Sequence, residues 1–139
     1  MDETKQPGIK CNAIILKRSA FERQPIISLK PIVRSEFSLD VAIGDDNKKS
    51  SVVVGCIIKF LNEKEEVFAQ AEVEYLGLFE VDGQSENMDI SQFSNNSAPA
   101  IIFPYVRNYI HNLTLLSGIS QVIIPPVNIQ AAIQKVLKK

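Results

Sequence analysis

The chain has 139 residues and a mass of 15.5 kDa, with 45% hydrophobic and 22% charged residues, so we expect one globular domain over residues 1–139. This composition excludes a disordered chain or a disulfide scaffold, although the polar residues 1–8 are themselves expected to be disordered. The net charge is −1, and residues 41–97 carry four basic and eleven acidic side chains, which excludes a nucleic-acid-binding face of clustered lysine and arginine.

Four strands are predicted before residue 82. Residues 9–17 are rich in β-branched side chains, and residues 37–43 alternate apolar with polar side chains. Residues 51–61 are apolar on both faces near the middle, which indicates a central strand or an interface strand. In residues 67–81 the odd positions are mostly small or apolar, and the carboxylates fall on the other side. We expect the four strands to form a largely antiparallel meander.

A long connection is predicted between the first two strands, over residues 19–35. Pro25 and Pro31 prevent a stable helix there, so the segment is expected to be extended. It is unusually apolar for a loop, and its apolar side chains are Ile26, Ile27, Leu29, Ile32 and Val33. Connections of this length are uncommon inside compact domains unless they serve a function, so we expect a functional role.

Helical spacing begins after a polar loop over residues 83–97. From Ala100 to Leu116, apolar residues recur every three or four positions, which predicts one long helix. Pro104 falls within its first turns, and Gly118 suits a C-terminal cap. Residues 127–137 predict a short last helix. Strands followed by helices favour an α+β fold, in which both helices pack on one face of a four-stranded antiparallel sheet.

The sequence offers no catalytic or cofactor constellation. His111 is the one histidine, so no zinc ligand set can be assigned, and the glycines are too scattered for a phosphate-binding loop. Glu72 and Glu74 are two residues apart on a strand, which is also the pattern of an ordinary solvated sheet face. We therefore expect no enzyme, no cofactor and no metal, with an enzyme using Glu72, Glu74 or His111 as the weaker alternative.

No export signal or membrane segment is visible. The polar start does not lead into an apolar signal-peptide core, and the longest apolar run, residues 52–58, is far shorter than the roughly 20 residues that cross a bilayer as a helix. Cys11 and Cys56 are expected to be reduced packing residues. We expect a cytoplasmic protein with no direct membrane insertion.

Two motifs near the end of the chain carry a family resemblance. The segment Ala98–Arg107, APAIIFPYVR, followed by Gln121–Asn128, QVIIPPVN, resembles the protein-export chaperone SecB family. Fainter similarity runs through residues 21–22, 36–40 and 72–79. The resemblance implies an ATP-independent holdase that binds unfolded polypeptides, such as precursors for export, keeps them unfolded and works as a homotetramer built as a dimer of dimers.

The resemblance also implies where these clients bind. In the family they lie along apolar grooves formed by the connection after the first strand, the second strand and the last helix. The matching client-binding positions are Phe21, Ile26, Ile27, Phe37, Leu39, Val41, Ile129, Ile133, Val136 and Leu137. Ordinary core packing is the alternative for each of them.

Subunit contacts are implied for the first and last strands and the long helix. The matching positions are Ala69, Ala71, Val73, Tyr105 and Tyr109. The small side chains on the last strand would allow close packing between subunits. An intramolecular core face is the alternative for that strand.

The family's docking surface for the SecA translocase motor is acidic and apolar, and here the match is partial. Glu22 and Glu72 fit it, whereas Arg18 stands where an acidic residue is usual and Gln70 where an apolar one is usual. The family's acidic C-terminal tail is also missing. A SecB-like chaperone of a toxin–antitoxin system, acting on an antitoxin, is therefore one alternative, and an adaptor domain for one folded partner is another.

Overall fold

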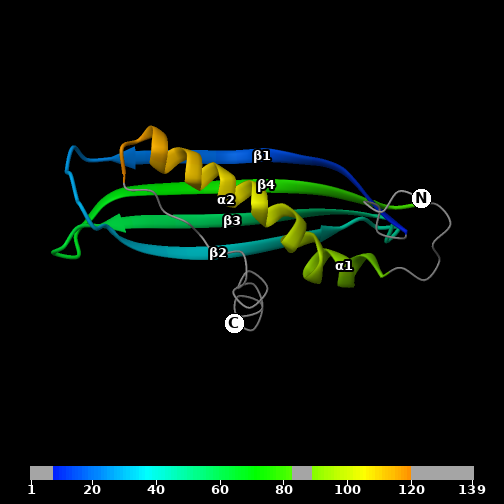
Figure 1. The fold of residues 1–139 in the computed structure, drawn as a ribbon. Coiled ribbons are helices and arrows are strands. Elements are labelled where there is room, and N and C mark those ends of the chain that lie inside the picture. The colour runs from blue at the N-terminus through cyan, green and yellow to red at the C-terminus, as the bar shows by residue number, and fades with distance from the viewer. Residues whose placement is uncertain (1–7, 83–88, 120–139) are drawn as a thin grey trace.

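The computed structural model describes residues 8–82 and 89–119. Its elements, shown in Figure 1, are β1 (Ile9–Arg23), β2 (Ile32–Ile43), β3 (Lys49–Leu61), β4 (Val67–Val81), α1 (Ile90–Asn96) and α2 (Ala98–Leu116). The short last helix expected at 127–137 lies outside the described residues. So does all but Gly8 of the segment expected to be disordered.

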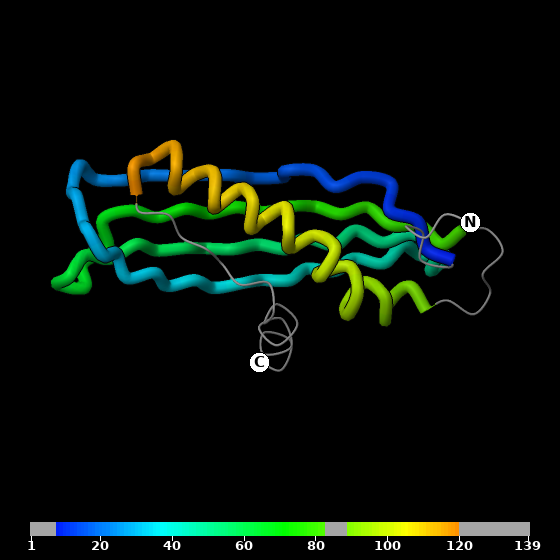
Figure 2. Tube along the Cα trace, in the orientation of Figure 1, coloured from blue at the N-terminus to red at the C-terminus, as the bar shows by residue number. Residues whose placement is uncertain are grey.

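The four strands form one antiparallel sheet in the order β1-β4-β3-β2. β2, β3 and β4 make the expected meander, and β3 is central, as its apolar residues on both faces predicted. The prediction of a meander is wrong for β1, because β1 pairs with β4 and not with β2, the strand that follows it in sequence. The connection between β1 and β2 therefore crosses the end of the sheet from one edge to the other (Figure 2).

The connection itself is shorter than expected. Residues 19–23 continue β1 and pair with Val73 to Ala69 of β4, and β2 begins at Ile32, so the connection covers only residues 24–31. Phe21 consequently lies in β1. Pro25 and Pro31 both lie in the connection, outside the strands, where their missing backbone donors cost no ladder hydrogen bond.

Both described helices lie on one face of the sheet, which we call the helix side; the opposite face is the open face. α2 crosses the helix side diagonally, from the β2 edge toward β1 (Figure 1). The core between the two layers is made largely by Val52, Val54, Ile58, Phe60, Ala71, Val73, Phe79, Ile102, Val106 and Ile110. Gly77 of β4 permits this close approach, since a Cβ there would lie 2.8 Å from the Ile102 Cδ1.

The prediction of a polar loop over residues 83–97 is wrong for residues 90–96, which form α1. The Asp89 carboxylate accepts hydrogen bonds from the backbone amides of Ser91 and Gln92, at 3.0 and 3.2 Å, and so caps the helix. The Phe93 ring packs on Phe79 with centroids 5.3 Å apart. Polar composition concealed this helix, whose buried face has few apolar residues.

α2 confirms the long helix predicted from Ala100 to Leu116, and begins two residues earlier. Ala98 and Pro99 occupy its first positions, where a missing amide hydrogen matters least. Gly118 adopts a left-handed φ of 72°, and the Ile119 amide donates to the Thr114 carbonyl at 3.1 Å. Gly118 is thus the predicted C-terminal cap.

Candidate binding surfaces

The helix side is only partly covered over β2. Its odd-numbered residues other than the exposed Ser35 are half-buried toward the helices, because β2 is an edge strand and α2 runs away from it. Phe37 packs edge-on against Phe103 of α2 with centroids 5.7 Å apart, and Leu39 packs on the same ring. Val41 packs against the main core. These three predicted client-binding residues therefore share one half-open apolar row.

The remaining predicted client-binding residues fall into three groups. Phe21 is half-buried on the helix side of β1, against the core. Ile26 and Ile27 are exposed on the connection, at 36% and 87% of their surface. The last four are outside the described residues, namely Ile129, Ile133, Val136 and Leu137.

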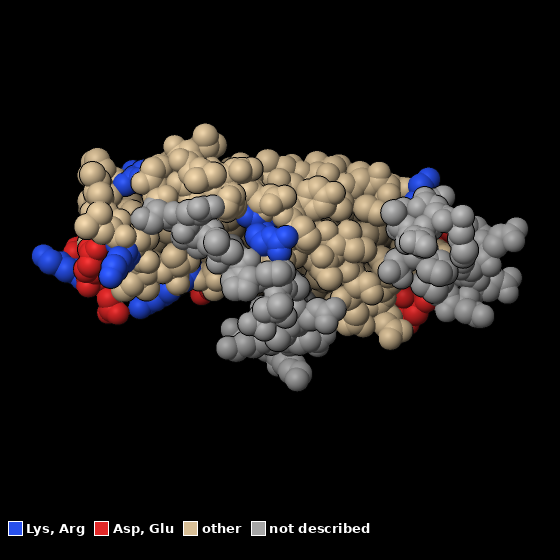
Figure 3. All heavy atoms as spheres, viewed as in Figure 1, with Lys and Arg blue, Asp and Glu red and all other residues tan. Residues whose placement is uncertain are grey.

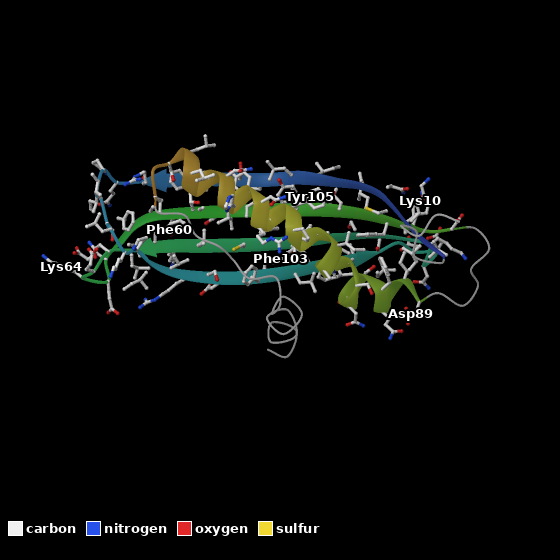
Figure 4. The ribbon with its side chains drawn as sticks, viewed as in Figure 1. Lys10, Phe60, Lys64, Asp89, Phe103 and Tyr105 are labelled. Carbon is white, nitrogen blue, oxygen red and sulfur yellow. The ribbon has the colours of Figure 1, made fainter. Side chains whose placement is uncertain are left out.

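Several apolar residues join these surfaces without having been predicted to bind clients. Leu29 on the connection is 84% exposed, and Leu116 at the end of α2 is 86% exposed. Phe103 lies toward β2, whereas Tyr105 lies on the other side of α2 toward β1 (Figure 4). Phe103 stands within the family motif, yet only the fold shows that it meets Phe37. Much of the face seen in Figure 3 carries no charged side chain: the charges gather at the two ends, apart from a basic group near the middle.

The residues predicted for subunit contacts divide between core and surface. Ala69, Ala71 and Val73 are almost completely buried in the protomer's own core, which is the intramolecular alternative for that strand. Tyr105 is 45% exposed and Tyr109 is half-buried. The Tyr105 ring lies 5.8 Å from that of Tyr75. Burial raises the pKa of Tyr75, and the neighbouring Tyr109 adds to the rise.

The four residues considered for translocase docking meet on the open face. The Arg18 guanidinium forms an ion pair with the Glu72 carboxylate at 3.1 Å, and the Gln70 amide donates to the same carboxylate at 3.4 Å. Glu22 pairs across the ladder with Gln70. Together they line a shallow hollow of about 330 Å³. The structure thus brings the four residues together, and it adds that the Arg18 guanidinium compensates the charge of the Glu72 carboxylate.

The two cysteines occupy different environments. Cys56 is buried in β3, and burial raises the pKa of its thiol to about 12, whereas Cys11 is exposed on β1. The packing role expected of both therefore holds for Cys56 alone. Within residues 8–82 and 89–119, no three His, Cys, Asp or Glu side chains cluster as metal ligands would. No helix in the same ranges is long and apolar enough to cross a membrane.

A family model described as preprotein translocase subunit SecB matches residues 2–139. The chain belongs to the SecB family. Members of the SecB family are chaperones and not enzymes, which removes the alternative of an enzyme using Glu72, Glu74 or His111.

Two relatives show how far the similarity to known proteins extends. An uncharacterized protein of Methanocaldococcus jannaschii is 27% identical over 133 residues, which span 93% of this chain and 84% of that protein. The protein-export protein SecB of Saccharophagus degradans is 29% identical over 102 residues, which span 73% of this chain and 60% of that protein.

A solved structure supports the SecB-like fold. The SecB-like chaperone Rv1957 of Mycobacterium tuberculosis, in complex with a ChAD peptide from the HigA1 antitoxin, superposes with a TM-score of 0.73 at 16% identity. The match covers 85% of this chain and 89% of that one. It confirms the predicted α+β fold, with a four-stranded antiparallel sheet followed by a long helix.

Proposed function

We propose that this SecB-family chaperone is an ATP-independent holdase, which binds unfolded polypeptides such as export precursors along its helix side and keeps them unfolded. The half-open apolar row of Phe37, Leu39 and Val41 carries the proposal. Ile26 and Ile27 add exposed apolar surface on the connection, and Phe21 lies on the helix side of β1. The proposed site also includes Ile129, Ile133, Val136 and Leu137.

Such a surface suits a disordered client better than a folded one. An unfolded chain exposes apolar side chains in no fixed arrangement, so a receptor gains most from a long apolar row with no selective pocket. Each 100 Å² of apolar surface removed from water contributes about 2.5 kcal/mol before ordering costs. A few hundred Å² of contact is therefore enough for measurable but reversible binding.

Assembly and location form part of the same proposal. We propose that the chaperone is a homotetramer in the cytoplasm and that Tyr105 and Tyr109 contribute to subunit contacts. The aromatic surface that Tyr105 exposes on α2 supports this role. Glu22 and Glu72 would form the part of the open face that docks SecA.

A second candidate is a chaperone whose client is an antitoxin. The Arg18–Glu72 ion pair favours it, because a neutralised carboxylate weakens an acidic surface for a translocase. Binding of a purified SecA motor that Glu72→Gln abolishes would support export. Client binding combined with no SecA binding would support the antitoxin candidate.

The main test is suppression of aggregation without ATP. A chemically unfolded client is diluted into buffer, and light scattering is followed with increasing amounts of the chaperone. We expect scattering to disappear near one tetramer per client. Unchanged scattering at several-fold molar excess would contradict the proposal, and selective capture of one folded protein would indicate an adaptor instead.

A matched pair of variants locates the binding surface. Ile26→Thr/Ile27→Thr should weaken client affinity about 10-fold, because two exposed apolar side chains lose their contact area. Ile57→Thr is the control, since Ile57 is as exposed as Ile26 but faces the open side. Equal weakening by both would show that clients do not select the helix side.

A further inference from the structure

Arg23, the last residue of β1, lies where three segments of the chain meet. One of its guanidinium nitrogens, Nη2, donates to the Ile26 carbonyl at 2.5 Å, and Nη1 donates to the Ser117 carbonyl at 2.6 Å. Nε donates to the Gln24 carbonyl at 3.1 Å. All three side-chain nitrogens of Arg23 therefore bind backbone carbonyls, two on the connection and one at the end of α2.

The surroundings of Arg23 favour this arrangement. Its guanidinium lies 5.8 Å from the ring centroid of Phe68, a residue that is itself buried in β4. Ser117 caps α2, so its carbonyl belongs to the negative end of the helix dipole, which attracts a cation. Among the described residues, no carboxylate forms an ion pair with Arg23.

These bonds bring together two apolar segments that are far apart in sequence. The carbonyls of Ile26 and Ser117 share one guanidinium, so the connection and the C-terminal end of α2 are adjacent at the same end of the molecule (Figure 1). Next to those carbonyls stand Ile27 and Leu116, whose side chains are 87% and 86% exposed. Among the described residues, no other side-chain hydrogen bond joins the connection to α2.

We infer that Arg23 is a positioning residue, which clamps the connection onto the end of α2 so that the exposed apolar side chains of both form one pre-arranged client-binding surface. The inference rests on the proposed holdase function. Pre-arrangement strengthens binding because the side chains need not be ordered when the client arrives. Only an arginine can do this, since a lysine has a single nitrogen in place of a planar set of donors.

A second contact holds the middle of the connection independently. The Ser28 hydroxyl donates to the Glu63 carboxylate, in the turn between β3 and β4, at 2.9 Å. The backbone amide of Glu63 itself and this hydroxyl lower the pKa of the Glu63 carboxyl. Loss of Arg23 should therefore loosen residues 24–27 and 115–119 more than residues 28–30.

Arg23→Lys tests the inference, with Arg34→Lys as the matched control. Arg34 lies exposed on β2, and within the part of the chain that the structure describes its one ion pair is with the Glu65 carboxylate, at 3.7 Å. The probe is reduced, carboxymethylated α-lactalbumin, which stays unfolded, and its affinity is measured by fluorescence anisotropy. Arg23→Lys should weaken binding about 10-fold at an unchanged melting temperature, because ordering two or three side chains lowers affinity on that order. Arg34→Lys should bind like the wild type.

Hydrogen exchange separates the inference from the proposed function. Arg23→Lys should speed exchange in residues 24–27 and 115–119 together, and unchanged exchange or unchanged affinity would overturn the positioning role. If Arg23→Lys does not fold, the wild-type protein still tests the positioning role of Arg23. Added probe should then slow hydrogen exchange in residues 24–27 and in residues 115–119 together. Protection of one segment alone would overturn the inference. A wild type that binds no probe would instead overturn the holdase function, whatever the exchange of Arg23→Lys.

Discussion

On β3, Ile58 has no exposed surface beneath α2, whereas its neighbour Ile57, on the open face, is 36% exposed. The same contrast runs along β4, where Val73 is buried on the helix side and Glu72 holds Arg18 on the open face. Alternate residues of one strand thus serve two purposes. The helix side stabilises the protomer, and the open face presents charge.

β2 lies between these two extremes. It is an edge strand beyond the reach of most of α2, so its inward residues are half-buried rather than sealed. Phe37 and Leu39 still pack on Phe103, yet they keep exposed area. A side chain in this position can contribute to the core and remain available to a client, which explains why core packing and client binding could not be separated from sequence.

The largest expected effect compares the two faces directly. Ile58→Ala should lower the free energy of unfolding by about 2–5 kcal/mol, because it removes buried methyl groups and leaves a cavity under α2. Ile57→Ala, one residue away, should change it by less than about 1 kcal/mol. Urea unfolding followed by circular dichroism measures both. Equal losses would show that the open face is also buried, as it would be in a larger assembly.

The second prediction uses the two cysteines. Folding raises the pKa of Cys56 from 9.0 to about 12, so above pH 9 the unfolded chain loses this proton before the folded one does. Stability should therefore fall as the pH rises, by about 2 kcal/mol between about pH 8 and 10.5. Cys56→Ala should remove that part of the fall, and Cys11→Ala should not.

Thiol labelling provides the control for this prediction. A thiol reagent at pH 8 should modify one cysteine per native chain, because Cys11 is exposed and Cys56 is buried. Labelling of Cys56 should require unfolding. A wild type and a Cys56→Ala variant with parallel stability curves up to pH 10.5 would contradict the buried-thiol explanation.

Sequence periodicity predicted the elements with strong, unbroken patterns. The alternation of β2 and the three-and-four spacing of α2 assigned both elements and the faces that they bury. The full length of β1 was harder to predict from sequence. Its ladder shifts register between Cys11 and Ala13 and again between Leu16 and Arg18, which breaks the alternation of apolar and polar residues. The pairing of β1 with β4 could not be predicted for another reason: alternation shows which residues share a face, but not which strand lies beside them.

The candidate sites also include residues that could be predicted from the sequence and residues that could not. Phe37, Leu39 and Ile27 could be named as candidates because the resemblance to the SecB family matches them to its client-binding grooves. Arg23 could not, since it belongs to no motif and acts through carbonyls of residues near and far in the chain. Backbone acceptors carry no sequence signal. Residues that position a surface are therefore harder to predict than residues that form it.

The smallest expected effect concerns the open face. Arg18→Ala breaks an ion pair whose two side chains are 62% and 29% exposed, so the free energy of unfolding should change by less than about 1 kcal/mol. Much of that change should vanish in about 0.5 M salt, which screens exposed charges within a few ångströms. Arg34→Ala, which breaks the longer pair with Glu65, is the control and should have an even smaller effect.

The functional part of this prediction is that client affinity stays unchanged in Arg18→Ala. Arg18 faces away from the helices, so removing it frees the Glu72 carboxylate without altering the apolar row of β2. Fluorescence anisotropy with the same unfolded probe measures the affinity. If Arg18→Ala weakened client binding as much as Ile26→Thr/Ile27→Thr, clients would contact both faces, and the division of the sheet into a client side and a charged docking side would be wrong. If instead only binding of a SecA motor increased, the two faces would act independently, and Arg18 would be the residue that limits docking on the open one.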